Sequence, residues 1–129
     1  MIAVDTSILV RYFVQDDPDL SARATYLLEE RLTANAPGLV TVVALQEMFW
    51  VLRRFYNQSA EQLRVILIEL CNAPNLIVQH REEVLEALSA PADFSDALIH
   101  HIGSALGAAK TLTFDKKFAR LDGVALLDA

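Results

Sequence analysis

The sequence predicts an α/β protein: a three-layer α/β/α sandwich with a central parallel sheet of about five short strands. Two observations predict this class. Short apolar runs alternate with longer segments whose apolar residues have helical spacing, and this alternation is typical of parallel sheets buried between helices. The chain has 129 residues and 53% hydrophobic content, enough for a core without disulfides or structural metal. We therefore expect one domain over residues 1–129.

The first half of the chain contains two predicted strands, each followed directly by a helix. The strands are expected at residues 2–4 and 39–43, where short apolar runs occur. Between them lies a further helix, which Asp17 caps and Pro18 begins, and which extends to about residue 32. The helix after the second strand has apolar residues at helical spacing: Leu45, Met48, Phe49, Leu52, Phe55 and Tyr56.

The second half continues this alternation. Ser59 and Gln62 predict a capping box before a helix with one apolar stripe, formed by Leu63, Ile66, Leu67, Leu70 and Cys71. The remaining predicted elements are strands at 76–78, 111–114 and 124–127 and helices at 82–89, 93–106 and 115–121. In such folds the ligand crevice lies beyond the carboxyl ends of the parallel strands. Polar residues that directly follow strands are therefore the candidates for a site.

Composition excludes some classes of function. A net charge of -6 argues against a protein that coats nucleic acid by charge alone, so any contact with nucleic acid must be local. No apolar run approaches the roughly 18 to 20 residues that span a bilayer, and no signal-peptide pattern is present. The single Cys71 cannot form an internal disulfide. We expect a soluble cytoplasmic protein that does not enter a membrane.

Three acidic residues lie where helices begin. Asp5 and Asp115 each follow a predicted strand, and each is equally well placed to cap a helix or to serve a site. Asp96 lies in the first turns of its helix, where the helix dipole favours an anion. It shares a helix face with Asp93 and His100, and an ordinary solvated face would explain these three residues as well.

Glu47 is a fourth acidic residue of interest. Its neighbours one helical turn away are apolar: Val43, Ala44, Trp50 and Val51. Burial of an unpaired carboxylate is costly, so we expect Glu47 to have an ion-pair partner, a raised pKa or a metal ion. Arg11 and Arg81 are the candidate ion-pair partners.

Together, Asp5, Glu47, Asp96 and Asp115 form a candidate metal site. Clustered carboxylates repel one another unless cations hold them, and oxygen donors without His or Cys partners favour Mg²⁺ or Mn²⁺. Such a site suits phosphoryl chemistry, because one or two metal ions can activate a water for in-line attack and stabilise the leaving oxygen.

Three segments around the candidate acids are distinctive: Ile2-Ala3-Val4-Asp5-Thr6-Ser7, Asp93-Phe94-Ser95-Asp96-Ala97-Leu98-Ile99 and Thr113-Phe114-Asp115-Lys116-Lys117-Phe118. They resemble the PIN domain, and specifically the VapC-type toxins of toxin–antitoxin pairs. The resemblance covers nearly the whole chain and implies that Asp5, Glu47, Asp96 and Asp115 are the acidic quartet, with Asp5 and Asp96 the most direct metal ligands. It implies that Asp93 is an accessory acid or a helix cap. It also implies that the hydroxyls of Thr6 and Thr113 lie near the site. The hydroxyl of Ser7 has a similar but weaker claim to such a position.

The resemblance further implies a Mg²⁺-dependent endoribonuclease that cleaves RNA through metal-activated water. An antitoxin protein would restrain it, and it would form a homodimer. His100 and His101 depart from the small residues usual at these positions, and we interpret them as structural residues and not as general bases.

Two other functions remain open. One is an interaction module that keeps the PIN fold without catalysis, which the presence of all four acids disfavours. The other is a different Mg²⁺-dependent phosphoryl-transfer domain, such as a receiver-like domain. No second acid flanks Asp5 at the spacing such a phosphoaspartate pocket requires, which disfavours this alternative.

Overall fold

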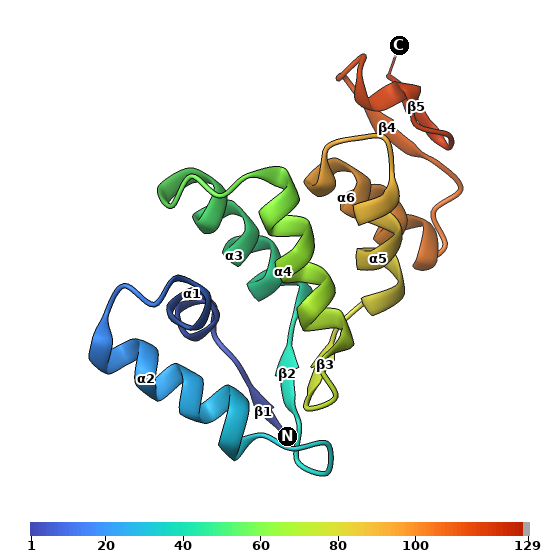
Figure 1. Ribbon diagram of the computed structural model, residues 1–129. Helices are drawn as coiled ribbons and strands as arrows, with labels where there is room; N and C mark the ends of the chain where they lie inside the picture. The colour runs from blue at the N-terminus through green and yellow to red at the C-terminus, as the bar shows by residue number, and fades with distance from the viewer. Residues whose placement is uncertain (128–129) are drawn as a thin grey trace. The chain divides into compact units, whose positions relative to one another are not determined.

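The computed structural model describes residues 1–127, and the chain divides into two compact units. The first unit is Met1–Gln79 and the second is His80–Ala129. In Figure 1 the first runs from blue to yellow-green and the second from yellow to red. We describe each unit by itself, and the single domain expected over residues 1–129 stays a prediction.

The first unit contains a three-stranded parallel sheet with the order β1-β2-β3. In the register of this sheet, Ile2 pairs with Gly38 and Leu39 pairs with Ile77. The elements in chain order are β1 (Ile2–Ala3), α1 (Thr6–Val14), α2 (Pro18–Tyr26), the π-helix η1 (Leu27–Arg31), β2 (Gly38–Val40), α3 (Val42–Phe55), α4 (Ala60–Asn72) and β3 (Leu76–Val78).

Side-chain caps begin the helices of this unit. The carboxylates of Asp5 and Asp17 accept backbone N–H groups at the starts of α1 and α2, as their positions predicted. The predicted capping box at the start of α4 is confirmed, because both of its hydrogen bonds are present between Ser59 and Gln62.

The strand predicted at residues 39–43 is too long. β2 ends at Val40, and Thr41 caps α3 by accepting the N–H of Ala44 on Oγ1 at 3.2 Å. Val42 and Val43 are β-branched and suggested a strand, but the cap places both in the first turn of the helix.

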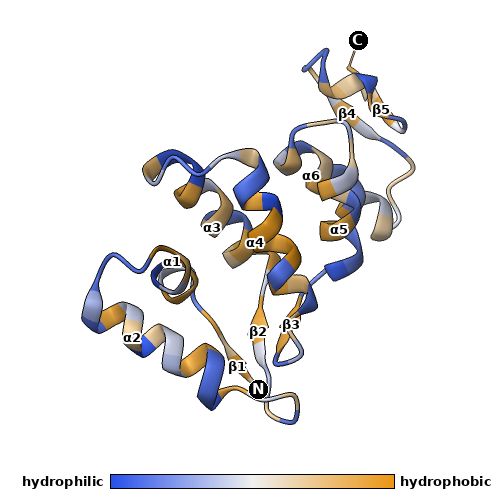
Figure 2. Ribbon diagram, viewed as in Figure 1, coloured by the Kyte–Doolittle hydropathy of each residue, from blue (hydrophilic) through white to orange (hydrophobic). Residues whose placement is uncertain are grey.

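The core of the first unit lies between the sheet and the helices that follow its strands. The helices α3 and α4 supply half of its buried apolar residues, and Figure 2 shows the hydrophobic stretches of α4 and the strands in orange. Fully buried side chains include Leu9, Leu45, Met48, Leu52, Leu63 and Leu67. Most of the predicted helical stripes therefore face the core, but Phe55 of α3 is 65% exposed and does not.

Tyr12 ties α1 to the π-helix, because its hydroxyl donates to Glu29 Oε2 at 2.7 Å. This hydrogen bond, with burial and the negative charge of Glu29, raises the pKa of Tyr12 to about 12. We expect one tyrosine to ionise near this pH in an ultraviolet absorbance titration, and Glu29→Gln to move that pKa towards the ordinary value. The bond favours the protonated phenol, so its stabilising effect is complete below pH 10 and is lost as the pH rises through 12. A titration that Glu29→Gln leaves unchanged would contradict this assignment.

The second unit contains a two-stranded parallel sheet in which Thr111 of β4 pairs with Val124 of β5. Its elements are α5 (Arg81–Ser89), α6 (Phe94–Ala105), β4 (Thr111–Thr113), the 3₁₀ turn η2 (Phe118–Arg120) and β5 (Val124–Leu126). Asp93 caps α6, and Gly107 follows the helix with a φ of 106°, a conformation that favours glycine.

The helix predicted at residues 115–121 is reduced to the 3₁₀ turn η2. Asp115 Oδ1 accepts the N–H groups of Lys117 and Phe118, and Leu121 then donates back to the carbonyl of Phe118. The 3₁₀ turn ends at Arg120, and residues 121–123 connect it to β5.

The predicted α/β class with five short parallel strands between helices is confirmed, and the strands form a three-stranded and a two-stranded sheet. Within residues 1–127, no helix has the length and hydrophobicity required to cross a membrane.

Candidate metal centre

Asp5 directly follows β1 and is exposed. Its Oδ2 accepts the hydroxyl of Ser7 at 2.6 Å and the backbone N–H of Ser7 at 3.1 Å. These two hydrogen bonds favour the charged carboxylate and lower the pKa of Asp5. Asp5 is thus both the cap of α1 and an ionised, accessible oxygen donor. Its predicted role as a metal ligand is compatible with this geometry.

Thr6 links the helix that Asp5 begins to the helix that carries Glu47. Its side chain is buried, and Oγ1 donates to the carbonyl oxygen of Ala44 at 3.3 Å. This hydrogen bond joins the first turn of α1 to the first turn of α3. Thr6 therefore has a positioning role, and its accessory role at the site stays a prediction.

Glu47 is exposed, so our interpretation of it as an acid embedded among apolar neighbours is wrong. The buried face of α3 consists of Leu45, Met48, Phe49 and Leu52. Glu47 lies on another face, with Val43 and Trp50, which are 73% and 51% exposed. Because α3 has apolar residues on both faces, its sequence pattern does not indicate which face is open to solvent.

The arginines considered as partners of Glu47 form other ion pairs. Arg11 pairs with Asp16 at 2.8 Å, and Arg81 pairs with Glu82 at 3.3 Å. Solvent can hydrate the exposed carboxylate of Glu47, so no buried partner is required. Its assignment as a metal ligand stays a prediction.

In the second unit, Asp93, Asp96 and Asp115 are near enough to influence one another. Burial raises the pKa of Asp96, and the negative charges of Asp93 and Asp115 raise it further. Asp93 Oδ1 also accepts the N–H groups of Ser95 and Asp96. Of the two roles considered for Asp93, that of helix cap is therefore seen directly, and that of accessory acid stays open.

Asp115 and Thr113 belong to one tight turn after β4. The N–H of Asp115 donates to Thr113 Oγ1 at 3.0 Å, while the carboxylate of Asp115 holds the turn that follows. Asp115 is exposed, like Asp5, and combines a capping role with an accessible carboxylate. Thr113 shapes the loop that presents it.

The donor set suits a hard divalent cation. The predicted ligands offer carboxylate oxygens, and three acids of the second unit repel one another in a way that a cation would offset. Within residues 1–127, no group of three or more His, Cys, Asp or Glu side chains is already arranged to hold a metal ion. The chemistry of the residues fits Mg²⁺, and the structure contains no preformed cage of ligands in its described part.

His100 and His101 have structural contacts within the second unit, as expected. Nδ1 of His100 lies 2.8 Å from Thr111 Oγ1, and Nδ1 of His101 lies 3.0 Å from Glu86 Oε2. A Cβ on Gly123, where φ is 85°, would lie 2.8 Å from the ring of His100. These contacts pack α6 against α5 and the small sheet.

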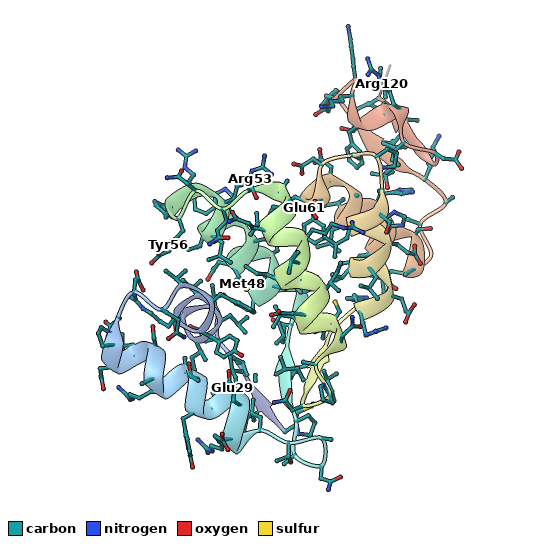
Figure 3. All side chains as sticks on the ribbon, in the orientation of Figure 1. Glu29, Met48, Arg53, Tyr56, Glu61 and Arg120 are labelled. Atoms are coloured by element: carbon teal, nitrogen blue, oxygen red, sulfur yellow. The ribbon has the colours of Figure 1, made fainter. Side chains whose placement is uncertain are left out.

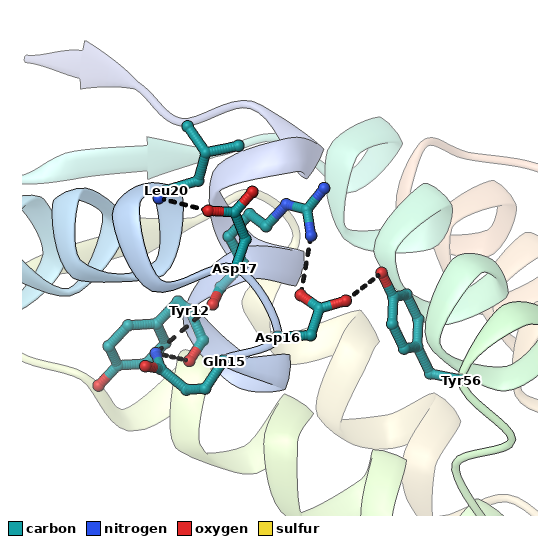
Figure 4. A network of polar contacts seen from close by, with 7 residues as sticks. Tyr12, Gln15, Asp16, Asp17, Leu20 and Tyr56 are labelled. Carbon is teal, nitrogen blue, oxygen red and sulfur yellow. Dashed lines mark hydrogen bonds and ion pairs between the residues drawn. The ribbon is translucent and has the colours of Figure 1, made fainter.

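A polar network in the first unit was not predicted from the sequence. Asp16, in the loop between α1 and α2, accepts Arg11 at 2.8 Å and the hydroxyl of Tyr56 at 3.2 Å (Figure 4). Burial alone would raise the pKa of Asp16, but these two partners lower it by more. Tyr56 follows the last turn of α3, near Arg53 (Figure 3). Asp16 and Tyr56 are forty positions apart in the sequence, so no local sequence pattern predicts this contact.

Parallel strands joined by helices, with acidic residues after two of the strands, define an α/β protein with a candidate metal centre. Comparison with known protein families matches residues 2–124 to the PIN domain. The chain therefore belongs to the PIN domain family. PIN domains are usually nucleases that use a divalent metal such as Mg²⁺. A search of curated proteins found no match to this chain.

Proposed function

We propose that this chain is a Mg²⁺-dependent endoribonuclease that acts as a single PIN domain over residues 1–129. The observation that carries the proposal is the family match, because it spans both units and includes all four predicted acids. The proposal assigns Asp5, Glu47, Asp96 and Asp115 to one metal centre.

The residues have distinct roles in this proposal. Asp5 and Asp96 are the most direct ligands of Mg²⁺ or Mn²⁺. Asp115 and Glu47 are the other two acids of the centre and add negative charge that attracts the cation. When bound, the metal activates a water for attack on the phosphodiester and stabilises the leaving oxygen. Ser7 orients the carboxylate of Asp5 and lowers its pKa through two hydrogen bonds, and Thr113 shapes the loop that presents Asp115. Asp93 fixes the start of α6, the helix that carries Asp96.

A narrower form of the proposal is a VapC-type toxin restrained by an antitoxin. It is supported by the three motifs around Asp5, Asp96 and Asp115. A homodimer belongs to this form and is supported by apolar side chains that α3 leaves exposed, namely Val43, Trp50 and Phe55. A cytoplasmic location also belongs to this form of the proposal. It is supported by the single cysteine of the sequence, which cannot form an internal disulfide.

Metal binding can be tested through thermal stability. A metal that binds only the folded chain stabilises it, by about 2.7 kcal/mol at a concentration one hundred times its Kd. We therefore expect Mg²⁺ or Mn²⁺ to raise the Tm of the wild-type protein by several degrees, and not to raise that of Asp5→Asn or Asp96→Asn.

The matched control is Asp122→Asn, which removes an exposed acid of the second unit outside the proposed centre. It should keep the metal-induced rise in Tm. A wild-type Tm that does not respond to either metal, or an equal response in all variants, would contradict the proposed centre.

A further inference from the structure

A groove lies between α1 and the segment formed by α2 and η1 in the first unit. Its volume is about 430 Å³, within the roughly 300 to 1,000 Å³ typical of ligand sites. Three arginines line it, Arg11, Arg23 and Arg31, and no acidic residue does. In a chain with a net charge of -6, this is a local concentration of positive charge.

The three arginines differ in how far their charges are compensated. Arg11 is held at 2.8 Å by Asp16, which Tyr56 also contacts, so its position is well defined (Figure 4). Arg23 lies 3.6 Å from Asp19, but both side chains are more than 70% exposed, and such pairs contribute little in water. Arg31 is exposed. Arg23 and Arg31 are thus accessible to an anionic ligand.

Arg31, in the π-helix, lines the same groove as Arg23. In a continuous α-helix, eight residues would separate these side chains by about 80° around the axis. Within η1 the N–H of Leu32 instead donates to the carbonyl of Leu27 at 3.0 Å, five residues back. This wider turn uses more residues per revolution and rotates Arg31 back towards Arg23. π-Helical turns of this kind are rare and often occur at functional sites.

The groove also has an apolar part and extends to Ser7. Ile8, Leu20 and Leu27 line it, with the largely exposed ring of Tyr26. Ser7 lines it as well, and Ser7 is the residue whose hydroxyl donates to Asp5 at 2.6 Å. The groove and the first proposed metal ligand are thus linked through Ser7.

We propose that this groove is the binding subsite for an unpaired RNA strand, with Arg23 and Arg31 on its phosphates and Tyr26 against a base. The inference rests on the proposed nuclease function and adds the place where the strand binds and the residues that hold it. An unpaired strand fits because its base faces are free to contact apolar and aromatic side chains, whereas in a duplex they are stacked inside. The guanidinium groups suit phosphates, which they can bind through two parallel hydrogen bonds.

The test is RNA binding measured by fluorescence anisotropy in EDTA, so that no metal-dependent cleavage takes place. A short labelled single-stranded RNA is compared with the same RNA annealed to its complement. The variant is Arg23→Gln with Arg31→Gln, and the matched control is Arg53→Gln, an exposed arginine of the same unit outside the groove. Circular dichroism checks that each variant is folded.

We expect the double variant to bind single-stranded RNA about tenfold more weakly, and Arg53→Gln to bind it nearly as the wild type does. The slope of log K against log salt should fall by about 1.4, because each phosphate contact of a single strand contributes about 0.7. Duplex RNA should bind more weakly than the single strand.

The inference would be overturned if the double variant and Arg53→Gln lost equal amounts of affinity for single-stranded RNA. It would also be overturned if duplex RNA bound more tightly than the single strand. Binding of an acidic peptide but not RNA would assign the groove to a protein partner and would also overturn it. Cleavage by the wild type in Mg²⁺ is measured separately. If it occurs while the double variant binds RNA normally, only the subsite fails. If it does not occur while binding depends on both arginines, only the nuclease proposal fails.

Discussion

Asp96→Asn and Asp5→Asn are expected to lower the rate of Mg²⁺-dependent RNA cleavage by at least about a thousandfold. Loss of a direct ligand removes metal-ion catalysis that supplies several kcal/mol, and each 1.36 kcal/mol corresponds to a factor of ten in rate. The rate is measured as single-turnover cleavage of a labelled RNA at saturating protein.

Both variants should remain folded, which separates this effect from unfolding. Asparagine caps helices about as well as aspartate, so Asp5→Asn can still accept the N–H of Ser7. Asp96→Asn removes repulsion from Asp93 and Asp115 and should not lower the free energy of unfolding. Asp122→Asn should cleave as the wild type does. Undiminished cleavage by Asp5→Asn or Asp96→Asn would refute their assignment as ligands.

Leu52→Ala is expected to lower the free energy of unfolding of the first unit by about 3 to 5 kcal/mol. Leu52 lies on the core face of α3 and has no exposed surface. Truncation removes buried methyl groups and leaves a cavity that the surrounding side chains fill only in part. Urea unfolding followed by circular dichroism measures the change.

Leu106→Ala is the matched control, since Leu106 is 74% exposed at the end of α6. This substitution should change the stability by no more than about 0.5 kcal/mol. Similar costs for the two variants would contradict the placement of the core.

The local structure of this chain was largely predictable because it depends on residues close in sequence. Asp17 with Pro18, and Ser59 with Gln62, begin their helices as their patterns indicate. The errors arose where a cap opposed a propensity. Thr41 places two valines in a helix, although β-branched residues favour strands.

The surroundings of the candidate site were less predictable, because they depend on which helix face is covered. The apolar neighbours of Glu47 suggested burial, but its face of α3 is open to solvent. The contact between Asp16 and Tyr56 joins segments that are distant in the sequence, and the π-helix departs from the regular helix that the pattern predicted. By contrast, the capping positions of Asp5 and Asp115 after strands were predicted from the sequence, while their roles as metal ligands stay predictions.

The most direct test of the central claim is RNA hydrolysis by the purified chain in water enriched in ¹⁸O, with Mg²⁺ and with EDTA. We expect cleavage only with Mg²⁺. Each cleavage should leave one phosphate monoester, which carries one ¹⁸O atom, and one hydroxyl end without label, because water is the attacking nucleophile. Cleavage that persists in EDTA, or ends that carry a 2′,3′-cyclic phosphate without ¹⁸O, would contradict metal-dependent hydrolysis by this chain.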